Sequence, residues 1–446
     1  MHVVTLPRNC NIYPYVRRGY RVNINAFTRR QFYGSVGVIA MISFALSLWI
    51  NRTTWFLGDD FAILTNRYFA AADGNWSQAL LLPHNDHLIA IPVLVFIGLG
   101  YIFGLDNHLA YMLPAITMHI AILLAIAIIL RKRCTSSLTA LSAVCCVAFI
   151  SAGYEVLMMA TNMAHVAPIF LGLYQLILVD HDGDISRQDL VASLLGVIAV
   201  LCAGTSIPLI AMITLFLILK RQFKRGLLIA APAATLWLMW FVKYGSLNHG
   251  VKGDIQYTTF NKMAQITQYV IKGMQGSLEA ISHIAGSSTL LIILCFLGLY
   301  KKSIKSPTIL MPFCMAVGSV LFYFITGFSR VTFGAPVSSR YVYLGAIFII
   351  PLVFIGLESL FEHVASLHIY TIVATIWISV MGIIGFLAAT ETSPYTDKVR
   401  VETLLAARNL VASGSTEISG TPSPIFDPNL TVDWIKRLVD NDMWND

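Results

Sequence analysis

Long apolar runs alternate with short polar segments along almost the whole chain. A helix needs about 20 consecutive apolar residues to cross the hydrocarbon core of a bilayer, and the longer runs approach that length. Because a spanning segment must satisfy its own backbone hydrogen bonds, such runs are expected to be helical. The pattern predicts about eleven transmembrane helices, at residues 34–50, 109–130, 136–152, 164–179, 190–204, 207–219, 227–243, 289–300, 308–327, 341–356 and 369–388.

One further apolar run, residues 88–103, decides the topology. It is interrupted by Pro92 and by glycines, which makes a continuous spanning helix less favourable. The basic clusters at 131–133, 220–225 and 301–305 lie on the same side of the membrane as the basic N-terminus only if this run does not cross it. Since cytoplasmic loops carry the excess of Lys and Arg, we expect an interfacial or re-entrant helix here, with the N-terminus cytoplasmic and the C-terminus external.

This reading divides the chain into three parts. Residues 1–33 form a basic cytoplasmic N-terminus, and residues 34–389 form a polytopic transmembrane domain with external loop one at 51–108. The polar segment 390–446 is an external tail that either packs over the external mouth or is disordered. The fold class is therefore an all-α integral membrane protein.

Composition agrees with a membrane protein and excludes several other classes. The chain is 57% hydrophobic and only 12% charged, with a mean hydropathy of +0.72, whereas soluble domains contain about 25% charged residues. The net charge of +7 comes from short clusters between apolar runs, so it does not form the basic patch of a nucleic-acid-binding protein. The cysteines fall in cytoplasmic or spanning segments, without zinc-site spacing, so no structural disulfide is expected.

Loop one carries the most informative polar residues. Asp59 and Asp60 follow the first predicted span, and His84, Asp86 and His87 stand at the start of the interfacial run. A carboxylate between lipid and water can have a raised pKa and act as a general base. The simpler alternative is that two acids only mark the exit of a helix into water. The two histidines, three residues apart, are predicted to share a helical face; a metal site there is a weaker alternative.

A second group of polar residues lies late in the chain. Arg330 and Arg340 fall on one predicted external loop, and Tyr341 follows at the start of a span. A guanidinium matches phosphate geometry with paired hydrogen bonds, so these arginines are candidates to bind a lipid phosphate. Glu155, near another external helix end, could line the same cavity. Alternatively, the arginines and the tyrosine are interfacial anchors.

The order of these motifs resembles a known superfamily. An external "DDF" after the first span, an "NDH" turn with a proline soon after it, and a late "SRY" are similar to motifs of the C-type (GT-C) integral-membrane glycosyltransferases. Within that superfamily the chain is similar to bacterial O-antigen-modifying, serotype-converting glucosyltransferases. The resemblance covers most of the membrane region and leaves out the tail.

The resemblance implies an inverting glycosyltransferase of the bacterial inner membrane. Asp59 or Asp60 would take a proton from the acceptor hydroxyl, and Arg330 and Arg340 would hold the phosphate of a polyprenyl-phosphate sugar donor. The turn from His84 to His87 would position donor or acceptor. The acceptor would be a cell-envelope glycan or lipid. Residues alone support the lipid-linked donor, because the external face has no nucleotide sugar and the chain has no nucleotide-binding glycine loop. No cofactor is required, although a divalent metal is compatible.

Two alternatives belong to other functional classes. A lipid-linked saccharide flippase or transporter usually carries ionisable residues within its spans and often internal repeats, whereas these spans are nearly free of charge. An O-antigen polymerase or ligase would rely on a large late external loop, for which residues 245–288 are the candidate.

Overall fold

The computed structural model describes residues 27–245, 259–300, 302–331, 334–361, 364, 367–415 and 419–444. The regular secondary structure of these residues is entirely helical, and their sole β-type contact is an isolated bridge between His84 and His87. The predicted all-α membrane architecture is therefore confirmed. Most of the predicted cytoplasmic N-terminus, residues 1–26, lies outside the described residues, as do residues 246–258 of the predicted late loop.

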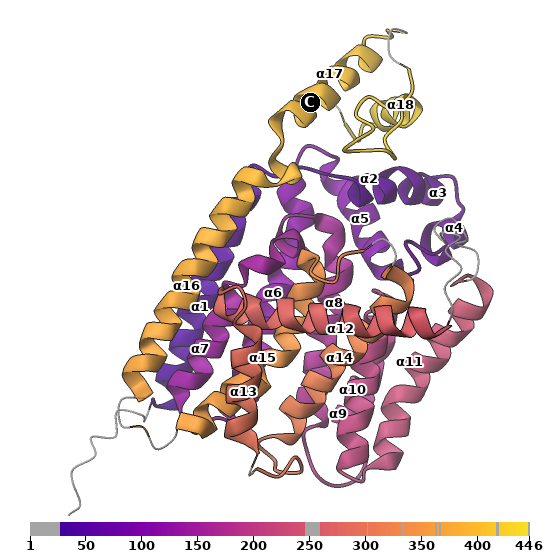
Figure 1. The fold of residues 1–446 in the computed structure, drawn as a ribbon. Coiled ribbons are helices and arrows are strands. Elements are labelled where there is room, and N and C mark those ends of the chain that lie inside the picture. Colours follow the sequence, from indigo (N-terminus) through magenta and orange to yellow (C-terminus); the bar gives the residue numbers. More distant parts are fainter. Residues whose placement is uncertain are drawn as a thin grey trace, which may run out of the picture.

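Eleven apolar helices run along the bundle in the described residues (Figure 1). They are α1 (Arg29–Asn51), α6 (His108–Arg131), α7 (Ser137–Ala148), α8 (Met163–Val179), α9 (Arg187–Val200), α10 (Ser206–Leu219), α11 (Phe223–Lys243), α13 (Ser288–Leu299), α14 (Leu310–Arg330), α15 (Ser339–Phe361) and α16 (Leu367–Thr392). Among the described residues, seven helices are long and apolar enough to cross a membrane, or eight if the bent pair of α7 and the following 3₁₀ segment η2 (Ser151–Leu157) counts as one. The chain is thus a multi-pass membrane protein, but the predicted count of eleven spans is not confirmed.

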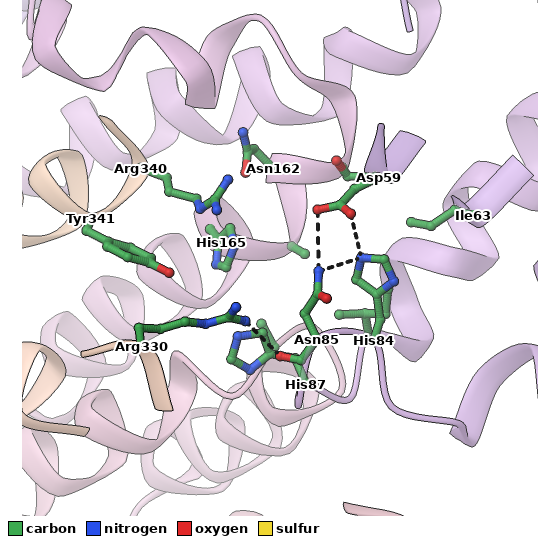
Figure 2. A pocket seen from close by; sticks show the side chains of 14 residues that line it. Asp59, Ile63, His84, Asn85, His87, Asn162, His165, Arg330, Arg340 and Tyr341 are labelled. Carbon is green, nitrogen blue, oxygen red and sulfur yellow. Dashed lines mark hydrogen bonds and ion pairs between the residues drawn. The ribbon is translucent and has the colours of Figure 1, made fainter. Parts of the chain in front are cut away.

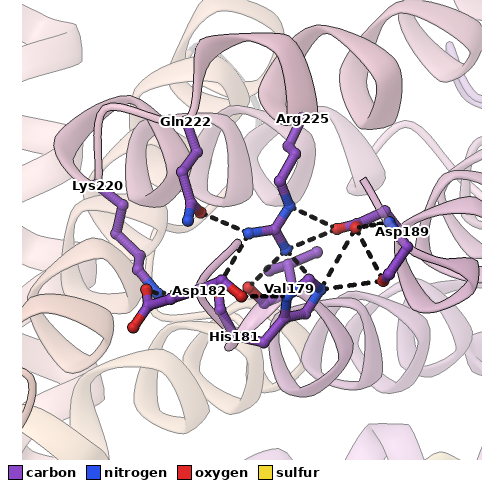
Figure 3. Close-up of polar contacts among 8 residues, drawn as sticks. Val179, His181, Asp182, Asp189, Lys220, Gln222 and Arg225 are labelled. Carbon is purple, nitrogen blue, oxygen red and sulfur yellow. Dashed lines mark hydrogen bonds and ion pairs between the residues drawn. The ribbon is translucent and has the colours of Figure 1, made fainter. Parts of the chain in front are cut away.

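The bundle has two chemically distinct ends. We call the end where α1 finishes and α6 begins the site end, and the opposite one the basic end. Two of the predicted basic clusters meet acidic partners at the basic end, where Arg133 lies 2.9 Å from Asp180. Nearby, Arg225 contacts buried Asp189 at 2.6 Å, and His181 is within 3.3 Å of the same carboxylate (Figure 3). This network joins the chain between α8 and α9 to the start of α11.

Loop one forms a cap of short helices at the site end. These are α2 (Asp59–Ala62), a π-helical turn η1 (Ile63–Arg67), α3 (Tyr68–Ala72), α4 (Trp76–Leu81) and α5 (Ala90–Phe103). With 14 residues, α5 is about 21 Å long, which is too short to cross the roughly 30 Å hydrocarbon core. This length agrees with the predicted non-spanning helix, but α10 has the same 14 residues, so the place of α5 in the membrane stays a prediction.

The predicted late external loop is mainly a helix, which corrects the expectation of a loop at 245–288. α12 (Thr259–Ser282) is amphipathic and runs across the bundle, packed on α14 and α15 (Figure 1). Gly273 permits this approach, because a Cβ there would collide with the ring of Tyr323. The Tyr323 hydroxyl also lies 2.8 Å from the Ser277 hydroxyl oxygen.

One buried histidine inside the bundle has polar partners on two neighbouring helices. His119, midway along α6, is buried; its ring nitrogens lie 3.3 Å from the Ser43 hydroxyl of α1 and 2.8 Å from the Tyr343 hydroxyl of α15. Unpaired polar groups at membrane depth are costly, so this three-helix contact explains why a histidine is tolerated there. It is consistent with packing and not with a ligand path.

The C-terminal segment is ordered and packs on loop one, which decides between the two alternatives predicted for the tail. It contains η5 (Pro394–Thr396), α17 (Lys398–Ala412) and α18 (Val432–Asp440). Figure 1 shows both helices beyond the site end of the bundle, next to α2 and α3. Trp444 is almost completely buried, with its ring 5.6 Å from that of Trp55 in loop one.

Candidate active site

A polar cavity lies at the site end, between loop one and the adjoining ends of the long helices. Its volume, including the open mouth, is about 520 Å³. Side chains from well-separated parts of the chain converge on it (Figure 2). The polar ones used in this account are Asp59, His84, Asn85, His87, Thr161, Asn162, His165, Arg330, Arg340 and Tyr341. Three segments distant in sequence therefore build one site.

Asp59 reaches the cavity from the first residue of α2. The residue before it, Gly58, has φ +49°, a conformation that L side chains rarely adopt, and this turn starts the helix. The Asp59 side chain is 39% exposed, and its Oδ1 lies 3.6 Å from His84 Nε2. Asn85 Nδ2 lies 3.5 Å from the other carboxylate oxygen. His84 and Asn85 thus orient the Asp59 carboxylate.

The electrostatic surroundings keep Asp59 ionised. Burial acts to raise the pKa of this carboxyl, but the contact with His84 and the charge of Arg340 outweigh it, so the pKa is lowered from its ordinary value of 3.8. Asp59 is therefore a carboxylate throughout the neutral range. A positioned carboxylate beside an open cavity can accept a proton from a bound hydroxyl group.

Asp60 faces the other way and does not line the cavity. Its fully buried carboxylate accepts hydrogen bonds from the backbone N–H of Thr161 at 2.8 Å and of Leu57 at 3.3 Å. Burial raises the pKa of Asp60 to about 7, although both backbone donors lower it. The structure thus separates the adjacent acids: Asp59 meets the cavity, and Asp60 ties α2 to the chain before α8.

The segment from His84 to His87 is a tight turn, and the prediction that its histidines share a helical face is wrong. Asn85 and Asp86 have φ +46° and +70°, and His84 and His87 exchange backbone hydrogen bonds of 3.0 and 2.9 Å. Two central residues with positive φ define a type I′ turn, which favours Asn and Asp. The helix α5 begins only at Ala90. Asn85 lines the cavity, whereas Asp86 is exposed and does not.

His87 forms the floor between the cavity and a neighbouring groove. Burial lowers its pKa to about 4, and the charges of Arg330, His84 and Arg340 act in the same direction. Its ring meets the His165 ring edge-on, with centroids 6.0 Å apart. A neutral imidazole here can donate or accept a hydrogen bond but carries no charge, so the positive field of the cavity comes from its arginines.

Two arginines enter the cavity opposite Asp59 (Figure 2). Arg330 is the last residue of α14, and its Nη2 donates a 3.2 Å hydrogen bond to the backbone carbonyl of Asn85. Arg340 is the second residue of α15, and its guanidinium lies 5.5 Å from the ring centroid of Tyr341. Both are placed by helix ends, so the cavity presents two cationic groups at fixed positions.

Glu155 stands behind Arg340 and does not line the cavity itself. Its Oε2 lies 3.9 Å from Arg340 Nη1 and has no hydrogen-bond partner. The Glu155 backbone is held at both ends, since its N–H donates to the Ser339 hydroxyl and its carbonyl accepts from Asn162 Nδ2. Glu155 therefore orients the arginine, and the expectation that it lines the cavity is corrected.

An apolar groove continues from the cavity between α10 and α14. It has a volume of about 410 Å³ including open space and shares His87, His165, Arg330 and Tyr341 with the cavity. Its other lining residues include Pro208, Phe322, Ile325 and Thr326. A cationic cavity that opens into an apolar groove fits an amphiphilic ligand with an anionic head and a hydrocarbon chain.

The metal alternative considered for the His84 to His87 turn finds no geometric support. Among the described residues, no group of three or more His, Cys, Asp or Glu side chains is placed to hold a metal ion. The turn itself explains this, because Asp86 is exposed at its tip while His84 contacts Asp59.

Comparison with known proteins identifies the fold. No protein-family model matches the chain, and no curated protein matches its sequence. Among solved structures it is similar to ArnT from Cupriavidus metallidurans bound to undecaprenyl phosphate, with a TM-score of 0.52 and 12% identity, over 92% of this chain and 85% of the ArnT chain. For ArnT in the apo state the TM-score is 0.56 and the identity 11%, over 91% and 84% of the two chains. The chain has an ArnT-like GT-C fold.

This GT-C fold brings together most of the residues that the sequence singled out. The cavity contains Asp59, His84, His87, Arg330, Arg340 and Tyr341, whereas Asp60, Asp86 and Glu155 lie outside its lining. Asn85 and Asn162 were missed by sequence reasoning. The Asn-Asp pair was itself a turn signal that could have identified Asn85. Nothing in the sequence around Asn162 distinguishes it from an ordinary residue near a helix start.

Proposed function

We propose that this protein is a membrane glycosyltransferase that moves a sugar from a polyprenyl-phosphate donor to a cell-envelope glycan or lipid. The observation that carries the proposal is that ionised Asp59 faces Arg330 and Arg340 across one cavity, which opens into an apolar groove. A base, an anion-binding pair and a channel for a hydrocarbon chain are the groups this transfer requires. The GT-C fold supports the same reaction class.

The donor follows from the shape of the site. The polyprenyl chain would lie in the groove beside Phe322 and Ile325, and its phosphate would meet Arg330 and Arg340 at the junction with the cavity. Paired guanidinium hydrogen bonds suit a phosphate that carries two or three acceptor oxygens. The ArnT structure with undecaprenyl phosphate bound supports a lipid partner of this kind.

The chemical step is a single displacement. Asp59 takes the proton of an acceptor hydroxyl as the hydroxyl oxygen attacks the anomeric carbon, and the bond from that carbon to the phosphate oxygen breaks. The sugar is transferred with inversion, and the polyprenyl phosphate leaves with the bonding electron pair. Arg330 and Arg340 stabilise the negative charge that develops on the phosphate. His84 and Asn85 hold the Asp59 carboxylate toward the hydroxyl.

The other residues that the sequence singled out would support this arrangement. Asp60 would fix α2 through Thr161, and Glu155 would hold Arg340 in place. Tyr341 would pack against the donor, while His87 would provide a neutral hydrogen-bonding group. On the topology predicted from basic residues, the site end faces the outside of a bacterial inner membrane, with the N-terminus cytoplasmic and the C-terminus external.

The test compares cells that carry the wild-type gene, no gene, or the variants Asp59→Asn and Arg340→Gln. Mass spectrometry of surface and lipid-linked glycans measures the hexose-sized mass that the wild type is expected to add. The mass should disappear in both variants while membrane insertion stays unchanged. If the glycans are the same with and without the gene, the transferase proposal is wrong and the flippase or transporter alternative takes its place.

A further inference from the structure

The C-terminal segment holds the loop that carries Asp59, although none of its described residues lines the cavity. We call residues 397–415 and 419–444 the C-terminal clamp. It lies beyond the site end in Figure 1, over α2 and α3. It contacts several parts of loop one, and two of its hydrogen bonds fall on residues 56–58, the three residues that lead into Asp59. The clamp is therefore next to the site in space and distant from it in sequence.

Two charged side chains of the clamp bind this stretch of backbone. Asp427 Oδ1 accepts a 3.2 Å hydrogen bond from the N–H of Gly58, and Arg400 Nη1 donates to the carbonyl of Phe56. The two side chains lie 3.7 Å apart and are fully buried. Both peptide groups before the acid pair are thus fixed by residues more than 340 positions away in sequence.

Gly58 is the turn residue before α2, so the contacts that hold it also affect the direction of α2. Its φ of +49° and ψ of −105° lie outside the helical region, and the next residue, Asp59, already begins α2. A rotation at Gly58 would change the direction in which α2 leaves the turn. The N–H of Leu57 donates to Asp60, and the N–H of Asp60 donates back to the carbonyl of Leu57. Fixing residues 56–58 therefore fixes the orientation of both acids.

Stability alone does not account for this buried pair. Removing two charges from water is costly, and apolar residues often stabilise such a position equally well. Moreover, Arg400 Nε and Nη2 and Asp427 Oδ2 have no hydrogen-bond partner. The clamp gains its packing elsewhere: Trp434 stacks on Phe69 with centroids 5.1 Å apart. The charged pair is instead matched to the backbone groups of Phe56 and Gly58.

We propose that Asp427 and Arg400 are positioning residues, through which the C-terminal clamp aims Asp59 into the cavity. The inference rests on the proposed function, because it gives the clamp a role in the reaction of the Asp59 carboxylate. It assigns the clamp no contact with donor or acceptor. Loss of the clamp contacts should therefore affect the chemical step more than donor binding.

The test uses membranes that contain the full-length protein and the endogenous acceptor, with undecaprenyl phosphate bearing radiolabelled glucose as the donor probe. Asp427→Ala removes the acceptor for the Gly58 N–H, and kcat is expected to fall about ten- to a hundredfold, since small misplacements of catalytic groups cost that much. The KM for the donor should change less than about twofold, in contrast to loss of a donor contact. The fall of kcat on the acid side of the pH profile should also move to higher pH, because Asp59 would move away from His84 and Arg340, which lower its pKa.

Matched variants separate positioning from folding. Asp427→Asn keeps an oxygen that can accept from Gly58 and should restore most of the kcat lost in Asp427→Ala. Asp427→Glu keeps the charge beside Arg400 but displaces the oxygen, so it should insert normally and still have a low kcat. Asp73, at the end of α3, forms an exposed 3.0 Å ion pair with Arg437 of the clamp. Asp73→Asn removes only this ion pair and should leave the kinetics unchanged.

The outcomes distinguish this inference from the proposed function. If Asp59→Asn is inactive while Asp427→Ala and Asp427→Glu match the wild type in kcat and pH profile, the clamp does not position Asp59 and only this inference fails. If Asp59→Asn retains full activity, the assignment of the base fails, and with it the role given to the clamp. A variant of Asp427 that loses kcat and shifts the acid-side fall of kcat to higher pH while it keeps the donor KM supports the inference.

Discussion

Asp59 and Asp60 are adjacent in sequence, yet their carboxylates occupy opposite environments. The Asp59 carboxylate faces the polar cavity beside His84, whereas the Asp60 carboxylate is enclosed against the backbone N–H of Thr161. The pKa of Asp59 is lowered and that of Asp60 is raised to about 7. A pair of acids with such divergent pKa values allows the base to be identified by titration.

The pH dependence of activity should identify Asp59 as the base. Its pKa is lowered below the ordinary value of 3.8, so kcat/KM should stay constant as the pH falls from neutral towards that value. If Asp60 were the base, activity would fall as the pH drops through about 7, the pKa of that carboxyl. Initial rates in membranes, with protein integrity checked at each pH, decide between the two residues.

Asp60 should instead influence the pH dependence of stability. Its pKa is raised from 3.8 to about 7, so the folded protein keeps a proton that the unfolded chain loses. This stabilisation is complete below about pH 4 and is lost as the pH rises through about 7, with a slope of up to about 1.4 kcal/mol per pH unit. Asp60→Asn removes the titration, so the difference in thermal stability between wild type and variant in detergent should change over this window. A difference independent of pH would contradict the assignment.

Replacement of either cavity arginine by lysine should weaken the reaction even though the charge remains. A lysine cannot form the paired hydrogen bonds of a guanidinium with a phosphate. Arg330→Lys and Arg340→Lys should each lower kcat/KM for a polyprenyl-phosphate sugar about five- to 150-fold, equivalent to about 1–3 kcal/mol of transition-state stabilisation. The control is Arg52→Lys, since Arg52 is exposed at the end of α1 and stacks on Trp49 away from the cavity. Equal activity of all three variants would exclude a phosphate-binding role.

Narrowing the apolar groove should discriminate between donors by chain length. Ile325→Trp adds bulk inside the groove and should raise the KM for a long-chain polyprenyl donor several-fold, with little effect on a short-chain analogue. Val320→Trp is the matched control, because Val320 lies on the same helix, is 41% exposed and does not line the groove. A similar effect on both donors would show that the hydrocarbon chain does not occupy the groove.

The sequence pattern was sufficient to predict the general architecture, because membrane helices are recognisable as long runs of apolar residues. It also predicts that α5 does not span the membrane, because the distribution of basic residues constrains the topology of the whole chain. The number of spans is less certain, because α9, α10 and α13 each have 14 residues or fewer. Pattern could not reveal that α12 is a helix lying across the bundle, as its placement depends on the close approach of Gly273 to Tyr323.

The site was predictable by residue type but not by orientation. An acid pair soon after the first apolar run and two arginines beside a late apolar run were enough to single out Asp59, Arg330 and Arg340 as candidates. Whether Asp59 or Asp60 faces the cavity depends on one backbone turn at Gly58, and that turn is held by Asp427 near the other end of the chain. No local pattern contains such a contact. The same reasoning applies to the type I′ turn, which places Asn85 in the lining of the cavity and leaves Asp86 exposed.

The contacts of Phe56 and Gly58 with Arg400 and Asp427 also bear on biosynthesis. These pairs are separated by 344 and 369 residues, so each contact can form only after its C-terminal member has been synthesised. The described bundle helices, α1 to α16, all precede the clamp in the chain. A nascent chain interrupted before residue 427 would therefore contain all of these helices but lack the contact that holds Gly58.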